Sequence, residues 1–409
     1  MLRIAIVGAA VAGFAAARAL RRQSFAGEIV AVGAERHRPY DRPPLSKAFL
    51  TGACSVPDLA LDDPDEDLDV RWRLGTPAAR LDPGNRRLVL DDGEEIRADG
   101  VIVATGARAR QLPDAGGLAN VHTLRTLDDA IALRAALLSA QRLVVVGAGF
   151  IGAEVASSAR SLGLDVTVVE ALPVPLAGPL GAEMGAVCAR LHGDHGVRLH
   201  TGVPVARLAG TAPAGSASVR SASVRSARVE AVELADGTRL PADVVLAGIG
   251  VRPNVEWLAG SGLAISGGVV TDESGATNLP AVVATGDCAM SFNRHAGRAI
   301  RSEHWTHAFE QPATAVATLL AGGGRLPPDR PAIPYFWSDQ YGVRIQFAGH
   351  REDGDTVRIV EGDTEQRSFV AVYERHGQPV AVLGMNQPKL FTRLRRQLAA
   401  PGPVPSAAP

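Results

Sequence analysis

The chain has 409 residues and a formal net charge of −1 at pH 7, with 46% hydrophobic and 21% charged residues. This is the composition of a globular protein that is long enough for two or three domains. The balanced charge gives no reason to expect nucleic acid or an anionic membrane as a partner. Cys54, Cys188 and Cys288 lie far apart without CxxC spacing. This spacing argues against a disulfide framework and a cysteine metal site, so no metal is expected.

The first residues, "MLRIAIVGAA", run directly into an expected β-strand and a glycine-containing turn. A secretory signal would need a charged region, an apolar stretch and a cleavage site before the fold begins. No apolar run reaches the roughly 18 residues that a membrane-spanning helix requires. We therefore expect a cytoplasmic protein that does not associate with a membrane.

One internal repeat dominates the chain. Residues 3–20 and 142–159 share a β-branched run, a glycine-rich turn and an alanine-rich helical stretch. The apolar runs at 27–33 and 165–170 then complete a βαβ unit in each copy. The copies are too far apart for solenoid units, and their spacing suits a duplicated domain. The repeat predicts two doubly wound sheets.

The second copy carries a complete dinucleotide-binding fingerprint. Gly147 suits the tight turn, Gly149 the close approach of a pyrophosphate, and Gly152 the packing of helix on strand. The helix N-terminus then offers free N–H groups to the phosphates. Glu170 ends the next strand, where a carboxylate accepts hydrogen bonds from a ribose 2′-hydroxyl and repels a 2′-phosphate. This copy therefore favours NADH over NADPH.

The first copy is imperfect, with Gly8, Ala10 and Gly13 at the three positions. The single methyl group of Ala10 is tolerated if the phosphate sits slightly further out. Glu35 is the candidate for the ribose carboxylate. Two copies in strand–turn–helix context predict that one chain binds two dinucleotides.

Further apolar runs outline the domains. The runs at 100–107 and 243–250 end in glycine and suit the points where the chain crosses between domains, and 282–289 contains another strand. Residues 208–228 hold an exact repeat, "SASVRSASVR", between strand-like flanks, which predicts a lengthened hairpin loop. From about residue 326 several short β-like runs predict a small, mostly β third domain.

The predicted fold class is α/β, with two doubly wound dinucleotide-binding domains and a small α+β C-terminal domain. We expect the first domain to be discontinuous, over residues 1–112 and 245–324, and the second to span 113–244. The C-terminal domain is expected at 325–398, followed by a disordered tail at 399–409.

Seven motifs stand in an order and spacing that resemble the FAD-dependent ferredoxin reductases of bacterial oxygenase systems, within the glutathione-reductase-like fold. Relatives of that family include rubredoxin reductases, apoptosis-inducing-factor flavoproteins and monodehydroascorbate reductases. The resemblance implies FAD in the first domain and NADH in the second. The motifs are "PYDRPPLSK" (39–47), "ATGARARQLP" (104–113), "LRTLDDA" (124–130), "VVVGAGFIGAEVA" (144–156), "GIGVRPN" (248–254), "ATGDCA" (284–289) and "FWSDQ" (336–340).

The resemblance implies roles at the flavin for four residues. Arg42 and Lys47 match positions that contact FAD, and Lys47 is expected beside flavin N5. Arg125 matches a flavin-binding arginine, and Asp287 matches the aspartate that holds a ribityl hydroxyl.

His304 and Trp305 match residues packed at the isoalloxazine, where a helix N-terminus stabilises negative charge on the reduced flavin. Trp337 matches an aromatic residue of the third domain that encloses the flavin. Pro312 lies inside the helix expected after Trp305 and is expected to kink or delay it.

On the nicotinamide side, Glu154 and Glu303 match carboxylates at the ring, and Gly250 matches a close backbone contact with NAD. Lys47 and Glu154 are predicted to form an ion pair with a catalytic role. The expected set of cofactor-binding residues is completed by Ala12, Ala78 and Ile151.

No cysteine pair stands near the predicted flavin site, where the sequence offers only Lys47 and the isolated Cys54. Electrons are therefore expected to leave reduced FAD singly or to pass to a small oxidant. The predicted function is hydride transfer from NADH to FAD, then single-electron transfer to a [2Fe–2S] ferredoxin serving a P450 or Rieske-type oxygenase. The exposed arginines expected to attract such a partner are Arg393, Arg395 and Arg396, and a monomer or weak homodimer is expected.

Two alternatives stay open. In the first alternative, the chain is an NADH-dependent reductase of a small acceptor such as monodehydroascorbate, rubredoxin or oxygen. In the second alternative, the chain is a flavoprotein that senses NADH and acts by interacting with another protein rather than as an enzyme.

Overall fold

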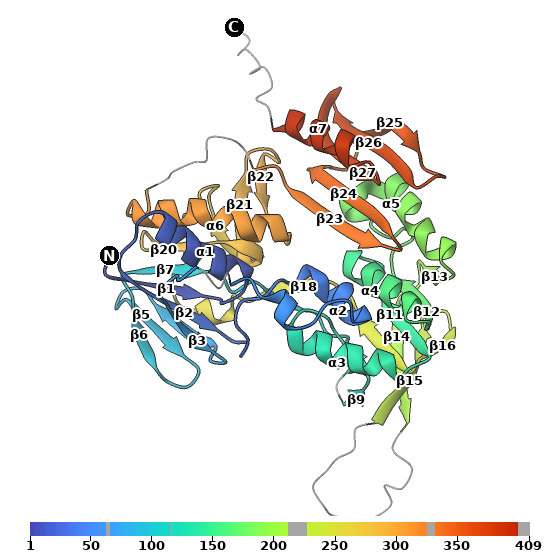
Figure 1. Cartoon of the computed structure of the whole chain (residues 1–409), viewed down its shortest axis with the longest axis horizontal. Helices are drawn as coiled ribbons and strands as arrows, with labels where there is room; N and C mark the ends of the chain where they lie inside the picture. The colour runs from blue at the N-terminus through green and yellow to red at the C-terminus, as the bar shows by residue number, and fades with distance from the viewer. Residues whose placement is uncertain (63–65, 116, 212–226, 325–331, 400–409) are drawn as a thin grey trace, which may run out of the picture.

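The computed structural model describes residues 1–62, 66–115, 117–211, 227–324 and 332–399 (Figure 1). The repeat predicted at 216–225 and the tail predicted at 399–409, apart from Ala399, lie outside these residues. None of the helices in the described part of the chain is long and apolar enough to cross a bilayer.

The first domain is built on a five-stranded parallel sheet in the order β20-β7-β1-β2-β3. Its central strands read as continuous aliphatic runs because both of their faces are buried. Helices α1 and α6 pack against each other beside this sheet (Figure 1). The elements are β1 (Arg3–Val7), α1 (Val11–Arg22), β2 (Glu28–Gly33), β3 (Val70–Leu74), β7 (Gly100–Val103), β20 (Val282–Ala284) and α6 (Trp305–Leu320).

Two small sheets and several short helices surround this core. The pairing of β20 with β7 returns a late segment of the chain to the first sheet, so this sheet is built from two separate segments of the chain. The peripheral elements are η1 (Pro43–Ser46), α2 (Ala48–Thr51), η2 (Pro57–Leu59), β4 (Ala78–Asp82), β5 (Arg87–Leu90), β6 (Glu95–Arg97), η4 (Glu256–Leu258), β19 (Val269–Thr271), η5 (Gly286–Cys288), β21 (Ala289–Asn293) and β22 (Arg298–Ile300).

The second domain repeats the plan with a parallel sheet in the order β10-β17-β11-β12-β13. An antiparallel β-sheet of β14, β15 and β16, with β9 added in parallel, lies beside it. The elements are η3 (Pro113–Ala115), β9 (Leu118–Ala119), β10 (Val121–His122), α3 (Leu127–Leu138), β11 (Arg142–Val146), α4 (Phe150–Ser161), β12 (Asp165–Glu170), α5 (Ala177–Asp194), β13 (Arg198–Thr201), β14 (Val205–Thr211), β15 (Ala227–Leu234), β16 (Arg239–Pro241) and β17 (Val244–Ala247).

One predicted domain boundary needs correction. Residue 245 falls inside β17, which pairs with β10 and β11 and therefore belongs to the second sheet. The chain crosses back only after Ala247, through a two-stranded ribbon of β8 (Ala107–Ala109) and β18 (Val251–Pro253). The sequence did not indicate this boundary, because a buried parallel strand is a continuous apolar run whichever of the two sheets it belongs to.

The C-terminal domain is an antiparallel sheet in the order β23-β24-β27-β26-β25, in agreement with the predicted small α+β unit. Helix α5 of the second domain packs on one face of this sheet, and α7 packs on the other through Phe391 (Figure 1). The elements are β23 (Tyr335–Gln340), β24 (Val343–Gly349), β25 (Thr356–Asp363), β26 (Ser368–Arg375), β27 (Gln378–Met385) and α7 (Pro388–Leu398).

The delay of the helix expected from Pro312 is not observed. Helix α6 begins at Trp305, without delay, and continues through Pro312 to Leu320. Proline removes one backbone hydrogen bond from a helix interior. Packing of α6 along α1, with Pro312 itself buried, maintains the helix on both sides of that position.

Candidate functional site

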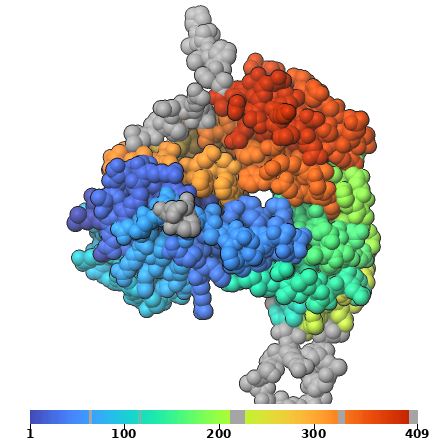
Figure 2. Space-filling model, viewed as in Figure 1, coloured from blue at the N-terminus to red at the C-terminus, as the bar shows by residue number. Residues whose placement is uncertain are grey.

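A large cavity lies where the three domains meet, and Figure 2 shows their surfaces adjoining on one face in blue, green and orange-red. Its volume is about 1170 Å³. That is more than the roughly 300–1,000 Å³ of pockets that hold one small ligand. The lining comes from the turns after β1 and β11, the β8/β18 ribbon, the start of α6 and strand β23. We call this space the interdomain cavity.

Three helix N-termini open onto the interdomain cavity. Helix α1 begins after Ala10, α4 after Gly149 and α6 after His304, and none of the three has a side-chain cap. The first backbone N–H groups of these helices are therefore free for a ligand. Together with the positive end of the helix dipole they attract phosphates and other anions.

The glycines at the two turns have the geometry that a dinucleotide cradle requires. Gly8 and Gly147 adopt φ values of 119° and 103°, in the region that favours glycine. A Cβ at Gly8 would lie 2.0 Å from the carbonyl oxygen of Ala104, and one at Gly147 would lie 2.4 Å from that of Gly248. A Cβ at Gly149 would meet no protein atom within 4 Å, so this glycine faces open space for a ligand.

Gly13 and Gly152 serve the packing of helix on strand. A Cβ at Gly13 would lie 1.7 Å from the carbonyl oxygen of Gly8, and one at Gly152 would lie 2.1 Å from that of Gly147. Both turns therefore fit a bound dinucleotide, including the first, where Ala10 replaces the middle glycine.

A carboxylate stands near each turn. Glu35 lines the cavity, where it accepts hydrogen bonds from Tyr40 Oη and Arg42 Nη2, both at 2.5 Å. Glu170 accepts hydrogen bonds from the backbone N–H groups of Ala148 and Leu172, both at 2.9 Å. The bond to Ala148 fixes the Glu170 carboxylate against the glycine turn of the second domain.

Arg125 and Asp287 form an ion pair of 2.5 Å at the cavity wall. Arg125 Nε also donates to the carbonyl oxygen of Ala107 at 2.9 Å, and Arg42 donates to the carbonyl oxygen of Arg125. These bonds hold both guanidinium groups in fixed orientations, as the planar five-donor group of arginine permits.

Aromatic side chains enclose one end of the cavity. Trp305 and Trp337 meet edge to face with ring centroids 6.0 Å apart, and Phe336 lies 4.8 Å from the His304 ring. Trp305 Nε1 donates to Asp41 at 2.7 Å, which fixes the indole. Burial lowers the pKa of His304 to about 4, so its imidazole is neutral at pH 7.

The predicted ion pair between Lys47 and Glu154 is confirmed, with 2.7 Å between Lys47 Nζ and Glu154 Oε2. Glu154 is only 3% exposed. Its carboxylate also accepts hydrogen bonds from Ser46 Oγ at 2.5 Å and from Ser338 Oγ at 2.7 Å. A buried carboxylate is tolerated in such surroundings because its charge is paired and both oxygens have donors.

Most of the residues predicted from the sequence line the interdomain cavity, although they come from segments far apart in the chain. Those at the cavity are Gly8, Ala10, Ala12, Glu35, Arg42, Lys47, Arg125, Gly149, Ile151, Glu154, Gly250, Asp287, Glu303, His304, Trp305 and Trp337. Glu303 is also ion-paired with Arg301 at 2.6 Å.

Five predicted residues are not among those that line the cavity: Gly13, Ala78, Gly147, Gly152 and Glu170. The glycines and Glu170 support the turns described above. Ala78 instead opens β4 and packs against the apolar cluster that includes Val7 and Val30, so its contact with a cofactor stays a prediction.

The sequence prediction missed several residues that shape the site. Ser46 and Ser338 bind Glu154, Tyr40 binds Glu35, and Asp41 binds Trp305. All four stand inside the motifs "PYDRPPLSK" and "FWSDQ", which was the only signal for them. The partners of Ser46, Ser338 and Asp41 lie more than 100 residues away in sequence, so spacing alone could not identify them.

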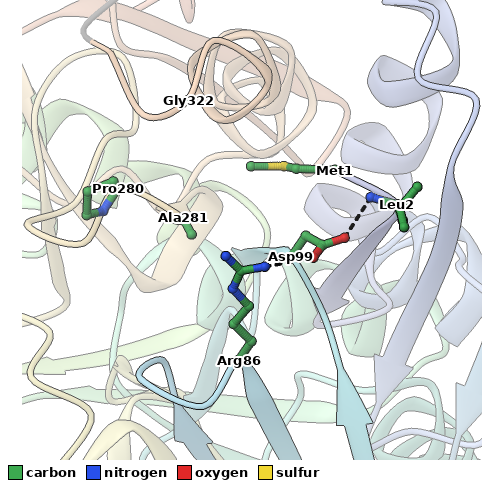
Figure 3. Close-up of a pocket in the computed structure, with 7 residues that line it drawn as sticks. All are labelled: Met1, Leu2, Arg86, Asp99, Pro280, Ala281 and Gly322. Carbon is green, nitrogen blue, oxygen red and sulfur yellow. Dashed lines mark hydrogen bonds and ion pairs between the residues drawn. The ribbon is translucent and has the colours of Figure 1, made fainter.

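A second hollow of about 410 Å³ lies near the N-terminus (Figure 3). Its acidic residue, Asp99, already accepts hydrogen bonds from the N–H groups of Leu2 and Arg3 and from Arg86. No predicted site residue lines this hollow.

Comparison with known proteins agrees with this architecture. Residues 2–312 match the family described as pyridine nucleotide-disulphide oxidoreductase, and residues 335–408 match the family described as reductase C-terminal. The chain belongs to the pyridine nucleotide-disulphide oxidoreductase family.

Similarity to individual oxidoreductases extends over nearly the whole chain. Rhodocoxin reductase of Rhodococcus erythropolis is 37% identical over 408 residues, which cover 98% of this chain and 91% of that protein. The biphenyl dioxygenase system ferredoxin–NAD(+) reductase component of Paraburkholderia xenovorans (strain LB400) is 38% identical over 384 residues, covering 93% and 86%. The structure of the covalent putidaredoxin reductase–putidaredoxin complex aligns with a TM-score of 0.89 at 33% identity, covering 97% and 93%.

The position of Glu170 predicts that the oxidoreductase prefers NADH to NADPH. Glu170→Ala is expected to narrow this preference by about 1.5–3 kcal/mol, because a hydrogen bond to a charged group is lost. Steady-state kinetics with both cofactors measure the effect. Glu170→Gln removes the charge but keeps a side-chain oxygen that can accept a backbone hydrogen bond, so it separates the two contributions. Glu183→Ala, at an exposed residue of α5, is the control. A parent enzyme with equal or higher kcat/KM for NADPH contradicts the prediction.

The ion pair predicts a kinetic signature for Lys47. Lys47→Ala is expected to slow reduction of the flavin by NADH more than it weakens NADH binding, because precise placement affects hydride transfer most. Single-turnover stopped-flow measurements at several NADH concentrations separate the two effects. Lys389→Ala, on the exposed surface of α7, is the control. Flavin reduction at the parent rate in Lys47→Ala would refute a catalytic role.

Proposed function

We propose that this oxidoreductase accepts hydride from NADH on a bound FAD and passes the electrons singly to a ferredoxin. One observation carries the proposal: two dinucleotide cradles open on one cavity, and no cysteine is among the residues that line it. Burial raises the pKa of Cys188 to about 12 and also raises that of Cys288, so both thiols stay protonated at neutral pH. A dithiol relay next to the flavin is therefore not available.

Different residues of the interdomain cavity bind the cofactors and orient their reacting groups. The turns at Gly8 and Gly147, with the helix N-termini after them, hold the two pyrophosphates. Lys47 and Glu154 orient the groups that meet between the cradles. FAD, when bound, takes up a two-electron hydride and releases electrons one at a time.

The names of similar proteins support a ferredoxin as partner. They include ferredoxin reductase components of oxygenase systems and a reductase solved in complex with putidaredoxin. We propose a [2Fe–2S] ferredoxin that serves a P450 or Rieske-type oxygenase, and a reductase that acts as a monomer or weak homodimer. A cytoplasmic location suits the three free cysteines.

Strand β23 and helix α7 offer a route from the cavity to the surface. Trp337 lines the cavity and stacks on Tyr335 with 6.0 Å between ring centroids. The guanidinium of Arg395 lies 3.9 Å from the Tyr335 ring centroid. Arg393 and Arg396 are exposed on the same helix. This surface suits an acidic electron-transfer partner.

The acceptor is tested by reducing the protein with NADH without oxygen and then mixing it with candidate oxidants. Reoxidation by a [2Fe–2S] ferredoxin is expected to be much faster than reoxidation by ascorbyl radical or oxygen. Fast transfer to a small oxidant alone would support a small-acceptor reductase. A reduced protein that persists with every oxidant would support the sensing alternative.

Removal of all three thiols is expected to leave electron transfer to the ferredoxin largely intact. The variant combines Cys54→Ser with Cys188→Ala and Cys288→Ala, since the latter two side chains are buried. NADH-dependent ferredoxin reduction, with FAD content measured in parallel, tests the expectation. Loss of most activity in a variant that retains FAD would contradict it.

Docking on α7 is expected to depend on charge. The double variant Arg393→Gln/Arg396→Gln should raise the KM for an acidic ferredoxin, and added salt should do the same, because exposed charges are screened over about 8–10 Å. Arg395 is left intact because it stacks on Tyr335. Arg80→Gln/Arg97→Gln, on the β4–β6 sheet, is the matched control. An unchanged KM in the α7 variant would rule out this docking surface.

A further inference from the structure

Strand β23 buries polar side chains beside the catalytic ion pair. Alternation along the strand places Phe336, Ser338 and Gln340 on its buried face, while Tyr335, Trp337 and Asp339 alternate with them. Ser338 is 0% exposed and Gln340 is 2% exposed. A buried hydroxyl and a buried amide destabilise a fold unless they are hydrogen-bonded. The hydrogen-bond partners of Ser338 and Gln340 therefore indicate why polar residues occupy these buried positions of β23.

The partners form a chain that ends on the carboxylate of Glu154. Gln340 Nε2 donates to Ser338 Oγ at 3.0 Å, and Ser338 Oγ donates to Glu154 Oε1 at 2.7 Å. Because the amide donates to the hydroxyl oxygen, the hydroxyl proton is free to point to the carboxylate. Gln340 thus sets the direction of the Ser338 hydrogen bond.

The two oxygens of Glu154 have different roles. Oε2 accepts from Lys47 Nζ and from Ser46 Oγ, both in the first domain. Oε1 accepts a hydrogen bond from Ser338 Oγ, and no other donor to Oε1 is found among the described residues. If Ser338 lost its hydroxyl, a buried carboxylate oxygen would have no donor. The carboxylate would then turn toward another donor, and Lys47 would move with it.

We propose that Ser338, directed by Gln340, is a positioning residue for hydride transfer, which acts by holding Glu154 and thereby placing Lys47 Nζ. The inference rests on the proposed function for its kinetic consequence, but its structural part concerns only the chain itself. It makes the C-terminal domain a participant in the reaction with NADH, in addition to its contribution to the cavity wall.

The composition of the chain provides a direct probe of Lys47. The sequence contains two lysines, Lys47 and Lys389. Lys389 is exposed on α7, whereas the Lys47 side chain is 22% exposed and ion-paired. Reductive methylation followed by mass spectrometry therefore reports the reactivity of Lys47 with Lys389 as internal reference. An amine held by a carboxylate has to leave it before it reacts, so loosening the pair accelerates labelling.

The full-length parent chain and four variants are labelled as purified, without NADH. Ser338→Ala is expected to raise the Lys47:Lys389 labelling ratio severalfold, and Ser338→Thr, which keeps the hydroxyl, is expected to restore the parent ratio. Gln340→Leu should raise the ratio less than Ser338→Ala does. The matched control is Ser368→Ala, which removes a hydroxyl that accepts from Gln387 elsewhere in the same domain.

The FAD-loaded variants are then reduced with NADH in single-turnover experiments. Ser338→Ala is expected to lower the limiting rate of flavin reduction about tenfold, as for one lost hydrogen bond to a charged group, with little change in the NADH concentration for half-saturation. Ser338→Thr should recover the parent rate. A general structural defect would instead lower both parameters and would not be rescued.

An unchanged labelling ratio in Ser338→Ala overturns the inference whichever acceptor the reductase uses. A raised ratio with parent rates of flavin reduction overturns the positioning role in hydride transfer. If Ser338→Ala fails to fold, the same two readouts on Gln340→Leu decide, since that change leaves the Ser338 hydroxyl in place. Failure of every ferredoxin to reoxidise the protein would refute the proposed function while leaving the labelling result valid.

Discussion

The buried carboxylate of Glu154 is the constraint on which the arrangement of the three domains depends. A charge that is 3% exposed has to be paired and hydrogen-bonded, or it destabilises the fold by several kcal/mol. The groups that meet here come from all three domains: Lys47 and Ser46 from the first, the acceptor Glu154 itself from the second, and Ser338 from the third. A shift of any one domain relative to the others would break at least one of these hydrogen bonds. The relative positions of the domains and the polar centre of the cavity are therefore coupled.

Around this centre, the parts of the cavity suited to binding phosphates lie apart from the side chains suited to hydride transfer. The helix N-termini offer free backbone N–H groups to phosphates, and any sequence that supplies the glycine turn can do this. Specific side chains are concentrated between the two cradles. On β23, Trp337 faces the cavity and the next residue, Ser338, binds Glu154. In the proposed function, this one short strand thus contributes to both the electron exit and the hydride side.

The chain uses its two kinds of cationic side chain differently. Arg42 and Arg125 each donate to more than one acceptor, and the rigid guanidinium plane suits walls that must keep a fixed shape. Lys47 is one of two lysines in the sequence, and it stands at the polar centre. An ammonium group is a compact point charge on a flexible stem, so its position is set by its partners. That is why the hydrogen bonds around Glu154 matter for Lys47.

The sequence by itself determined the two dinucleotide cradles, because a glycine turn between a β-branched strand and an alanine-rich helix is a local pattern. It also indicated Lys47 and Glu154 as a pair, through the motifs that carry them. Tertiary structure decided what local pattern does not contain. The strand β17 reads the same in either sheet, Pro312 is accommodated by packing against α1, and Ser338 is 184 residues away from Glu154. A buried polar residue looks like any other serine in a strand until the fold brings its partner within hydrogen-bonding distance.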